Sequence, residues 1–290
     1  MTSVVLQALQ EQNSADVVAR RLAGSVDPEL ARVVATIVRH LHQAVREVRP
    51  SMQDWRAAVE FLTEVGHASD ERRQEWVLLS DLLGVTQLVE EINSTRPKGA
   101  TPNTARGPFY RPDAPRLPLG ADICLDGAGE PLVVTGHVRD LDGRPVAGAS
   151  VETWQANGHG QYENQQPDLQ PEFNLRGHFR ADDNGDVTYR TVRPGGYKVP
   201  DDGPAGHLMG RLGYPLYRPA HISFLVSAPG FDTLSTQVYD RDDPNLDLDP
   251  LYGVKPELVA DLRRMPLAAP GPSWCLDFTF VLARSRKAGR

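Results

Sequence analysis

Proline and glycine divide this chain more sharply than any other feature of its sequence. Residues 1–100 contain three of the 24 prolines and four of the 25 glycines, and residues 101–290 contain the other 21 of each. Both residue types interrupt helices and mark turns. The asymmetry predicts an α+β protein, with a helical domain over residues 1–100 and an all-β sandwich over residues 101–290.

The first region has recognisable helix starts and apolar stripes. Asp27 precedes Pro28, which suits an N-cap before a proline at the first helical position, and Ser51 with Asp54 resembles a capping box. One further helix is predicted over residues 70–92. About 100 residues of amphipathic helix close no core of their own, so we expect them to cover the second region, a second subunit or both. The apolar stripe of the helix that follows Asp27 consists of Leu30, Val33, Val34, Ile37, Leu41, Val45 and Val48.

Beyond Gly107 the hydrophobic pattern changes to that of short strands separated by turns. Short strands punctuated by glycine and proline predict a β-sandwich or a barrel. The predicted strands are 133–138, 151–155, 187–192, 221–226 and 276–282.

The overall composition excludes several classes of protein. Lys and Arg number 31 against 38 Asp and Glu, a net charge of −7, which argues against nucleic-acid binding. No run approaches the ~18 apolar residues of a membrane span. The N-terminal segment lacks the basic residues of a secretory signal, and Cys124 and Cys275 are the only cysteines. We therefore expect reduced thiols in a cytoplasm.

Four turn motifs in the second region contain the side chains suited to chemistry. They are W-Q-A-N-G-H-G-Q-Y (154–162), N-L-R-G-H-F (174–179), R-P-G-G-Y-K-V-P (193–200) and R-P-A-H-I-S-F (218–224). Taken singly, their tyrosines and histidines would more often be packing residues of a sandwich. In this order and spacing the motifs resemble the intradiol ring-cleavage dioxygenases, the non-haem Fe(III) enzymes that open catechol-type rings.

Flanking segments extend the resemblance over nearly the whole chain. G-P-F-Y (107–110), L-S-T-Q (234–237) and L-D-L-D-P-L-Y-G (246–253) match the family pattern, and residues 164–174 are most similar to its hydroxyquinol and chlorocatechol branch. The resemblance implies a small aromatic diol and O2 as substrates and a muconate-type product. It also implies a homodimer formed through the helical domains, with lipid held in a tunnel between them.

The resemblance further implies an iron site. The family holds Fe(III) with two tyrosines and two histidines, and Tyr162, Tyr197 and His221 match three of these ligands. Fe(III) is a hard ion that prefers anionic oxygen donors. A bound cation lowers the pKa of a coordinated tyrosine.

The fourth ligand position departs from the family pattern, because Ser223 stands where the second histidine is expected. Residues 221 and 223 lie at i and i+2 of a strand, so both side chains face the same way. The serine hydroxyl is too short to replace an imidazole nitrogen. Three alternatives stay open: water fills the gap, His159 or His207 reaches it, or the site is poor in metal.

Further pocket residues follow from the resemblance. Arg218 is implied to stabilise negative charge on the ketonised substrate, and Gln237 to lie close to the iron. Tyr197, displaced by the substrate, is implied to act as a base. Leu82 and Val85 are candidates for setting the ring-substituent preference.

Two other hypotheses accompany the dioxygenase hypothesis. One is a divergent family member that acts on another phenolic metabolite, and the other is a catechol-binding protein without turnover.

Overall fold

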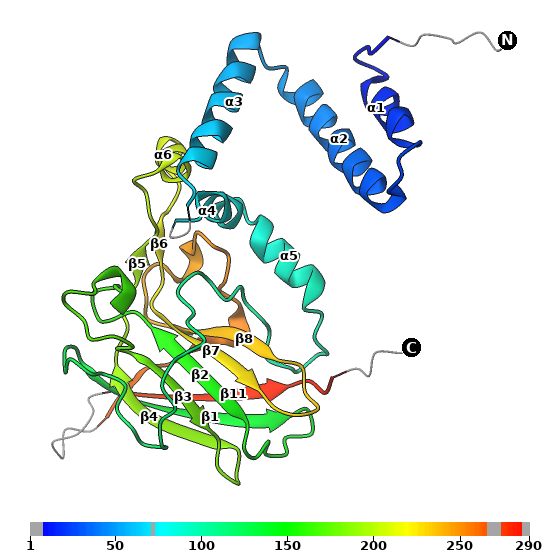
Figure 1. Ribbon diagram of the computed structural model, residues 1–290. Helices are drawn as coiled ribbons and strands as arrows, with labels where there is room; N and C mark the ends of the chain where they lie inside the picture. The colour runs from blue at the N-terminus through cyan, green and yellow to red at the C-terminus, as the bar shows by residue number, and fades with distance from the viewer. Residues whose placement is uncertain (1–7, 71–72, 266–273, 286–290) are drawn as a thin grey trace. The chain divides into compact units, whose positions relative to one another are not determined.

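The computed structural model describes residues 8–70, 73–265 and 274–285 (Figure 1). The chain divides into two compact units, residues 1–64 and 65–290, which are described separately below.

The first unit is helical, as the scarcity of proline and glycine predicts. It contains α1 (Ser14–Leu22), α2 (Pro28–Val48) and most of α3 (Met52–His67). The Asp27 carboxylate accepts a hydrogen bond from the Leu30 amide at 2.9 Å, so the predicted N-cap is confirmed. Ser51 and Asp54 exchange hydrogen bonds at the start of α3, which confirms the predicted capping pair.

The single helix predicted over residues 70–92 is wrong. The structure has two helices there, α4 (Glu75–Leu82) and α5 (Val85–Asn93), and residues 71–72 lie outside the described residues. Gly84 lies between them with φ of +71°, a left-handed conformation that a helix cannot continue through. The apolar periodicity continues across this break, which is why it suggested one helix.

The second unit contains the predicted β-sandwich (Figure 1). All five predicted strands are present, and the α+β class is confirmed. The four-stranded sheet has the order β10 (Arg263–Arg264), β11 (Trp274–Leu282), β1 (Pro131–Asp140), β4 (Asp186–Val192). The five-stranded sheet has the order β3 (Arg176–Arg180), β2 (Ser150–Gln155), β7 (His221–Ser227), β8 (Leu234–Asp240), β9 (Val259–Ala260).

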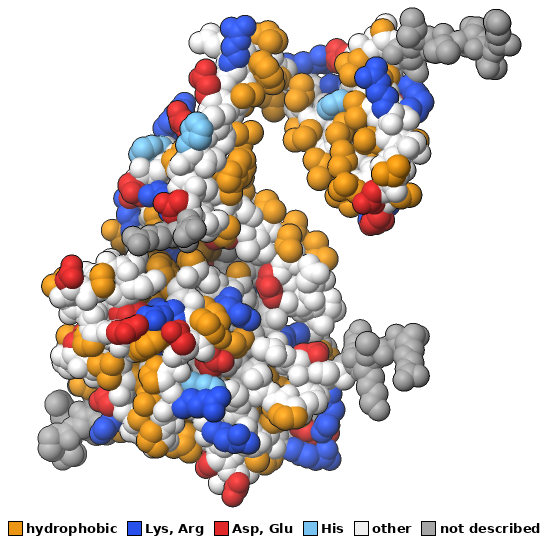
Figure 2. Space-filling view, viewed as in Figure 1, with side chains coloured by type: hydrophobic (Ala, Val, Ile, Leu, Met, Phe, Trp, Pro, Cys, Tyr) orange, Lys and Arg blue, Asp and Glu red, His pale blue; other side chains and the backbone are white. Residues whose placement is uncertain are grey.

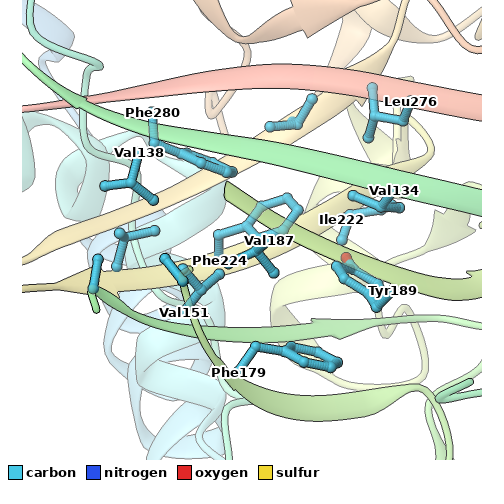
Figure 3. Close-up of a cluster of buried hydrophobic side chains, with 14 of the residues drawn as sticks. Val134, Val138, Val151, Phe179, Val187, Tyr189, Ile222, Phe224, Leu276 and Phe280 are labelled. Atoms are coloured by element: carbon cyan, nitrogen blue, oxygen red, sulfur yellow. The ribbon is translucent and has the colours of Figure 1, made fainter. Parts of the chain in front are cut away.

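Apolar side chains of the two sheets meet in one core (Figure 3). Along β1, buried residues such as Val134 and Val138 alternate with less buried ones, as expected of a strand with one face on a core. Ile222 and Phe224 of β7 meet Phe280 of β11 from the opposite sheet. The hydrophobic burial of these side chains stabilises the sandwich.

Strand β7 is buried on both faces, unlike β1. Ile222 and Phe224 point into the core, so His221, Ser223 and Leu225 point to the other face of the sheet. Loops and short elements cover that face and bury those three side chains as well. The candidate site lies on this buried polar face of β7.

Short elements surround this face. A two-stranded ribbon pairs β5 (Tyr197–Lys198) with β6 (Tyr217–Arg218), and α6 (Pro204–Arg211) lies between them in the chain. Glu75 of α4, which is fully buried, accepts a hydrogen bond from the Ala205 amide at 2.9 Å and so caps α6. The 3-10 turns are η1 (Glu163–Gln165), η2 (Leu246–Leu248) and η3 (Pro256–Leu258).

Candidate active site

The site begins with a row of residues across the central strands of the five-stranded sheet. Ser223 of β7 is in register with Trp154 of β2 and with Gln237 of β8. His221 is in register with Tyr239 of β8. The period of two along each strand therefore places these side chains on one face of the sheet.

Two glycine-rich loops bring the tyrosines over this face. Gly160 has φ of +76°, and a Cβ there would overlap the Gly196 carbonyl oxygen and lie 2.8 Å from the Tyr197 Cβ. The Gly195 amide donates to the Asn157 carbonyl at 3.0 Å. The loop that ends in Tyr162 and the loop that carries Tyr197 are thus in direct backbone contact, which only glycine allows.

The aromatic rings converge with the histidine. The centroids of the Tyr162 and Tyr197 rings are 5.8 Å apart, and those of Tyr197 and His221 are 5.7 Å apart. Phe109 stacks on Tyr162 at 4.1 Å with an interplanar angle of 17°. Tyr162 is almost fully buried, whereas Tyr197 is only half-buried.

His221 is poised to offer a nitrogen lone pair. Its Nδ1 donates to the Pro219 carbonyl at 2.8 Å, and its Nε2 is buried with no hydrogen-bond partner. Burial, assisted by the Arg218 charge, lowers the pKa of His221 to about 3. The imidazole is therefore neutral, with Nε2 unprotonated, which is the form that binds metal ions.

Arg218 is held by a buried hydrogen-bond network. The β5–β6 ribbon sets it opposite Tyr197, and its Nη1 donates to the Tyr197 hydroxyl at 3.3 Å. Its Nε donates to Asp249 at 3.0 Å, and its Nη2 to the Gln237 carbonyl oxygen at 3.0 Å and the Tyr239 hydroxyl at 3.2 Å. Burial alone would raise the pKa of Asp249, but the Arg218 guanidinium lowers it below its ordinary value. The pair is ionised, so the pocket holds a fixed positive charge beside Tyr197.

A second buried ion pair supports the first tyrosine. Arg176 Nε donates to Glu163 at 2.6 Å, and both side chains are at most 2% exposed. The Arg176 guanidinium carbon lies 5.9 Å from the Tyr162 ring centroid. Burial, and the neighbouring Tyr197, raise the pKa of Tyr162 well above its ordinary value, while Arg218 and Arg176 act in the opposite direction. A cation bound at its oxygen would reverse the effect of burial.

The structure brings together most of the predicted site residues but not all of them. Tyr162, Tyr197, His221, Ser223, Arg218 and Gln237 form one cluster. His159 and His207 are exposed and take no part in it. Leu82 is buried at the end of α4, and Val85 is about half exposed at the start of α5. Both flank the turn between α4 and α5, next to Asp81 in the chain. The positive charge of Arg218 acts to lower the pKa of Asp81, against the effect of burial.

Three site residues were not predicted. Tyr239 follows Gln237 by two residues in a strand, so the period of two could have identified it. Asp249 and Phe109 lie in the L-D-L-D-P-L-Y-G and G-P-F-Y segments, whose sequence suggests no role. Their contacts with Arg218 and Tyr162 depend on tertiary packing.

The donor set suits ferric iron. Among the described residues, no three His, Cys, Asp or Glu side chains lie together as a metal site. The candidate donors are instead two phenol oxygens and the unpartnered Nε2 of His221. Phenolate is a hard anionic ligand and imidazole a common partner for iron, so these residues fit Fe(III).

Comparison with known proteins decides the family. A family model described as Dioxygenase matches residues 106–284, and one described as Catechol dioxygenase N terminus matches residues 27–101. The chain belongs to the intradiol ring-cleavage dioxygenases. It is 47% identical to a hydroxyquinol 1,2-dioxygenase of Rhizobium sp. (strain MTP-10005), over 94% of this chain and 96% of that protein.

Solved structures of this dioxygenase family have the same fold. Hydroxyquinol 1,2-dioxygenase from Pseudomonas putida DLL-E4 matches with a TM-score of 0.91 and 37% identity, covering 95% of this chain and 99% of that one. Catechol 1,2-dioxygenase from Acinetobacter sp. ADP1 matches with a TM-score of 0.81 and 29% identity, covering 96% and 94%. The predicted family is confirmed, and this intradiol dioxygenase cleaves rings of the catechol type.

Proposed function

We propose that this dioxygenase binds one Fe(III) through Tyr162, Tyr197 and His221 and uses it to open a hydroxyquinol-type ring with O2. The observation that supports this most strongly is the convergence of two tyrosines on a buried, neutral histidine whose Nε2 has no partner. A buried polar atom without a partner is rare in folded proteins and calls for a ligand.

When held by Tyr162, Tyr197 and His221, the iron would supply Lewis acidity toward an aromatic diol. The protein residues handle charge and protons. Tyr197 is half-buried, and Arg218 donates to its hydroxyl, so the oxygen of Tyr197 is held where it could take a proton from a substrate hydroxyl. Arg218 also stabilises negative charge that develops on the ring, because Asp249 fixes it in place.

Gln237 acts as a donor in this scheme. Its carbonyl oxygen accepts hydrogen bonds from both Arg218 and Tyr239. This fixes the orientation of the amide and leaves the NH2 group to donate to oxygen atoms in the pocket.

The residues around the α4–α5 turn favour a substrate ring that carries a third hydroxyl. Burial raises the pKa of Asp81, while its contact with Thr86 and the charge of Arg218 lower it. A carboxyl group there could accept a hydrogen bond from a third ring hydroxyl, and Leu82 and Val85 would line the apolar side. We therefore place hydroxyquinol ahead of catechol, in agreement with the names of several relatives.

Product analysis with isotopic oxygen tests the function. Iron-loaded protein is given hydroxyquinol or catechol under 18O2, and oxygen uptake and product mass are followed. We expect one O2 consumed per ring and both labelled atoms in a muconate-type acid, with higher kcat/KM for hydroxyquinol. Absence of oxygen uptake with every catecholic substrate would contradict the proposal.

The Ser223 hydroxyl, which faces the site without a partner, favours a second candidate. A changed ligand set could direct the iron to another phenolic metabolite, or leave a protein that binds catechols without turnover. The variant Ser223→His discriminates between these readings. A gain of ring cleavage from an inactive parent would favour the second candidate, whereas an active parent favours the first.

We propose that residues 1–100 form a dimerisation domain and residues 101–290 the catalytic domain. The two matched family segments support this division. Many apolar residues of α2 and α3 are exposed, which supports a homodimer with lipid held between the helical domains (Figure 2). They include Leu30, Val33, Ile37, Leu41, Val45, Trp55, Val59 and Leu62.

The remaining observations concern location. Among the described residues, no helix is both long and apolar enough to span a membrane. Cys124 and Cys275 are unpaired thiols. Because unpaired cysteines are typical of reducing compartments, they support the proposal of a cytoplasmic enzyme.

A further inference from the structure

Two buried polar atoms without partners lie on the same face of β7. They are Nε2 of His221 and Oγ of Ser223, at positions i and i+2 of the strand. Their residues are only 3% and 1% exposed. Leaving a buried hydroxyl unpaired is destabilising, so such atoms normally have a partner. Other buried atoms of the described residues also lack a partner, among them Thr104 Oγ1 and Ser235 Oγ. His221 Nε2 and Ser223 Oγ differ from these because they lie together on the face of the candidate site, where a bound species can be their partner.

The two side chains differ in reach. The imidazole Nε2 is three bonds beyond Cβ, and the serine hydroxyl is one bond beyond it. A metal ion held by His221 Nε2 would therefore be beyond the reach of the Ser223 hydroxyl. An intervening water closes this gap, since a hydroxyl and a water hydrogen-bond at about 2.7–2.8 Å.

The neighbours of Ser223 do not supply another donor. Trp154, in register on β2, is part of an apolar cluster with Tyr162. Gln237, in register on β8, accepts hydrogen bonds from Arg218 and Tyr239 through its carbonyl oxygen, and its NH2 group makes no hydrogen bond with Ser223.

The two histidines considered from sequence are also excluded as donors. His159 lies in the exposed part of its loop, and His207 is exposed on α6. Both face solvent, whereas the atoms that lack a partner are buried.

We propose that Ser223 creates an exchangeable coordination position on the metal, occupied by a water that its hydroxyl holds. This rests on the proposed function, because it requires iron on Tyr162, Tyr197 and His221. The position would accept a small neutral nitrogen donor such as imidazole, which has the size of the side chain that serine does not provide.

Titration with imidazole tests the proposal. Iron-loaded protein is titrated anaerobically without substrate, and the visible tyrosinate-to-iron charge-transfer band is followed, so the readout does not depend on turnover. We expect a saturable shift of this band in the parent. In Ser223→His the side chain fills the position, and we expect at least tenfold weaker imidazole binding.

Two further variants keep the test decisive if the histidine variant folds poorly. Ser223→Leu blocks the position without offering a donor, so the imidazole response should be lost while the colour remains. Ser223→Ala leaves it open but holds water less firmly, so imidazole should bind at least twofold more tightly than in the parent.

The outcomes separate this inference from the proposed function. Equal imidazole binding by the parent, Ser223→His and Ser223→Leu would overturn the exchangeable position while leaving the iron site standing. Equal binding by the parent and Ser223→Ala would overturn the role of the hydroxyl. A colourless parent without iron, measured on the same sample, would overturn both proposals.

Discussion

At the scale of single residues, two buried ion pairs lie beside the tyrosines of this dioxygenase. Arg218 with Asp249 lies next to Tyr197, and Arg176 with Glu163 lies beneath Tyr162. A buried pair adds little stability over an apolar replacement, but removing one partner leaves an uncompensated charge. The role of these pairs is therefore to hold an arginine beside each tyrosine. Removing either partner of a pair should destabilise the fold.

Loss of Arg176 tests this reasoning by stability. Arg176→Met leaves the buried Glu163 with only the partly exposed Arg111, at 3.3 Å, as a cationic partner. We therefore expect the free energy of unfolding to fall by about 3 kcal/mol, the lower end of the range for a broken buried pair. Arg144→Met is the matched control, since Arg144 pairs with Asp142 at the surface, with both side chains more than 60% exposed. It should cost at most about 1 kcal/mol. Urea unfolding of the parent and the two variants measures these losses. Similar losses of unfolding free energy in both variants would contradict the argument.

His137 predicts a pH dependence away from the site. Its pKa is raised, mainly by the hydrogen bond to Asp186 at 2.8 Å and further by Asp277, against the effect of burial. A raised folded-state pKa means that the stabilisation is complete below the unfolded value of about 6.5 and is lost as pH rises through the folded value.

The variant His137→Asn tests this pH dependence. The difference in unfolding free energy between parent and variant should shrink as pH increases from 5.5 to 9. Urea midpoints measured across that range provide the test, and a difference that stays constant or grows with pH would refute it.

At the scale of elements, the strands were easier to predict than the helices near the site. Short apolar runs between glycine and proline turns identified β1 and β7, because a sandwich core requires such runs in its strands. Helix α6 was missed because its sequence, P-A-G-H-L-M-G-R, contains two glycines. It forms through the cap from Glu75, which is a tertiary contact and leaves no local signal.

The candidate site shows the same limit. Tyr162, Tyr197, His221, Arg218 and Gln237 were identified through motifs that resemble a family, since no local pattern marks a tyrosine as a ligand. Their convergence depends on the packing of the glycine loops and on strand register. Whether they bind iron remains a prediction.

The contact between the two tyrosine loops can be tested with one methyl group. In Gly160→Ala the new Cβ would overlap the Gly196 carbonyl, so the loops must separate and iron binding should weaken at least tenfold. Gly143→Ala is matched in backbone conformation, with φ of +77° against +76°, but has nothing within 4 Å. It should cost only about 1–2 kcal/mol of stability and retain the colour. Iron content and visible absorbance distinguish them, and equal iron loss would contradict the packing argument.

At the scale of the whole molecule, the exposed apolar face of α2 predicts assembly. Leu41 and Val45 lie on it and are 59% and 55% exposed. The double variant Leu41→Lys, Val45→Lys should convert a dimer of about 64 kDa, twice the chain mass of 31.9 kDa, to a monomer. Gln43→Lys, at an exposed polar position, is the control. Light scattering after size exclusion reports the mass, and a monomeric parent would disprove the dimer.

The central claim is that two tyrosines and one histidine suffice to hold ferric iron in this dioxygenase. The most direct measurement is a visible spectrum of the purified protein before and after anaerobic addition of hydroxyquinol, with iron quantified on the same sample. The account predicts a red protein with iron equimolar to the chain, and a band that shifts on adding hydroxyquinol and is lost in Tyr162→Phe. A colourless parent that cannot be loaded with iron would contradict it.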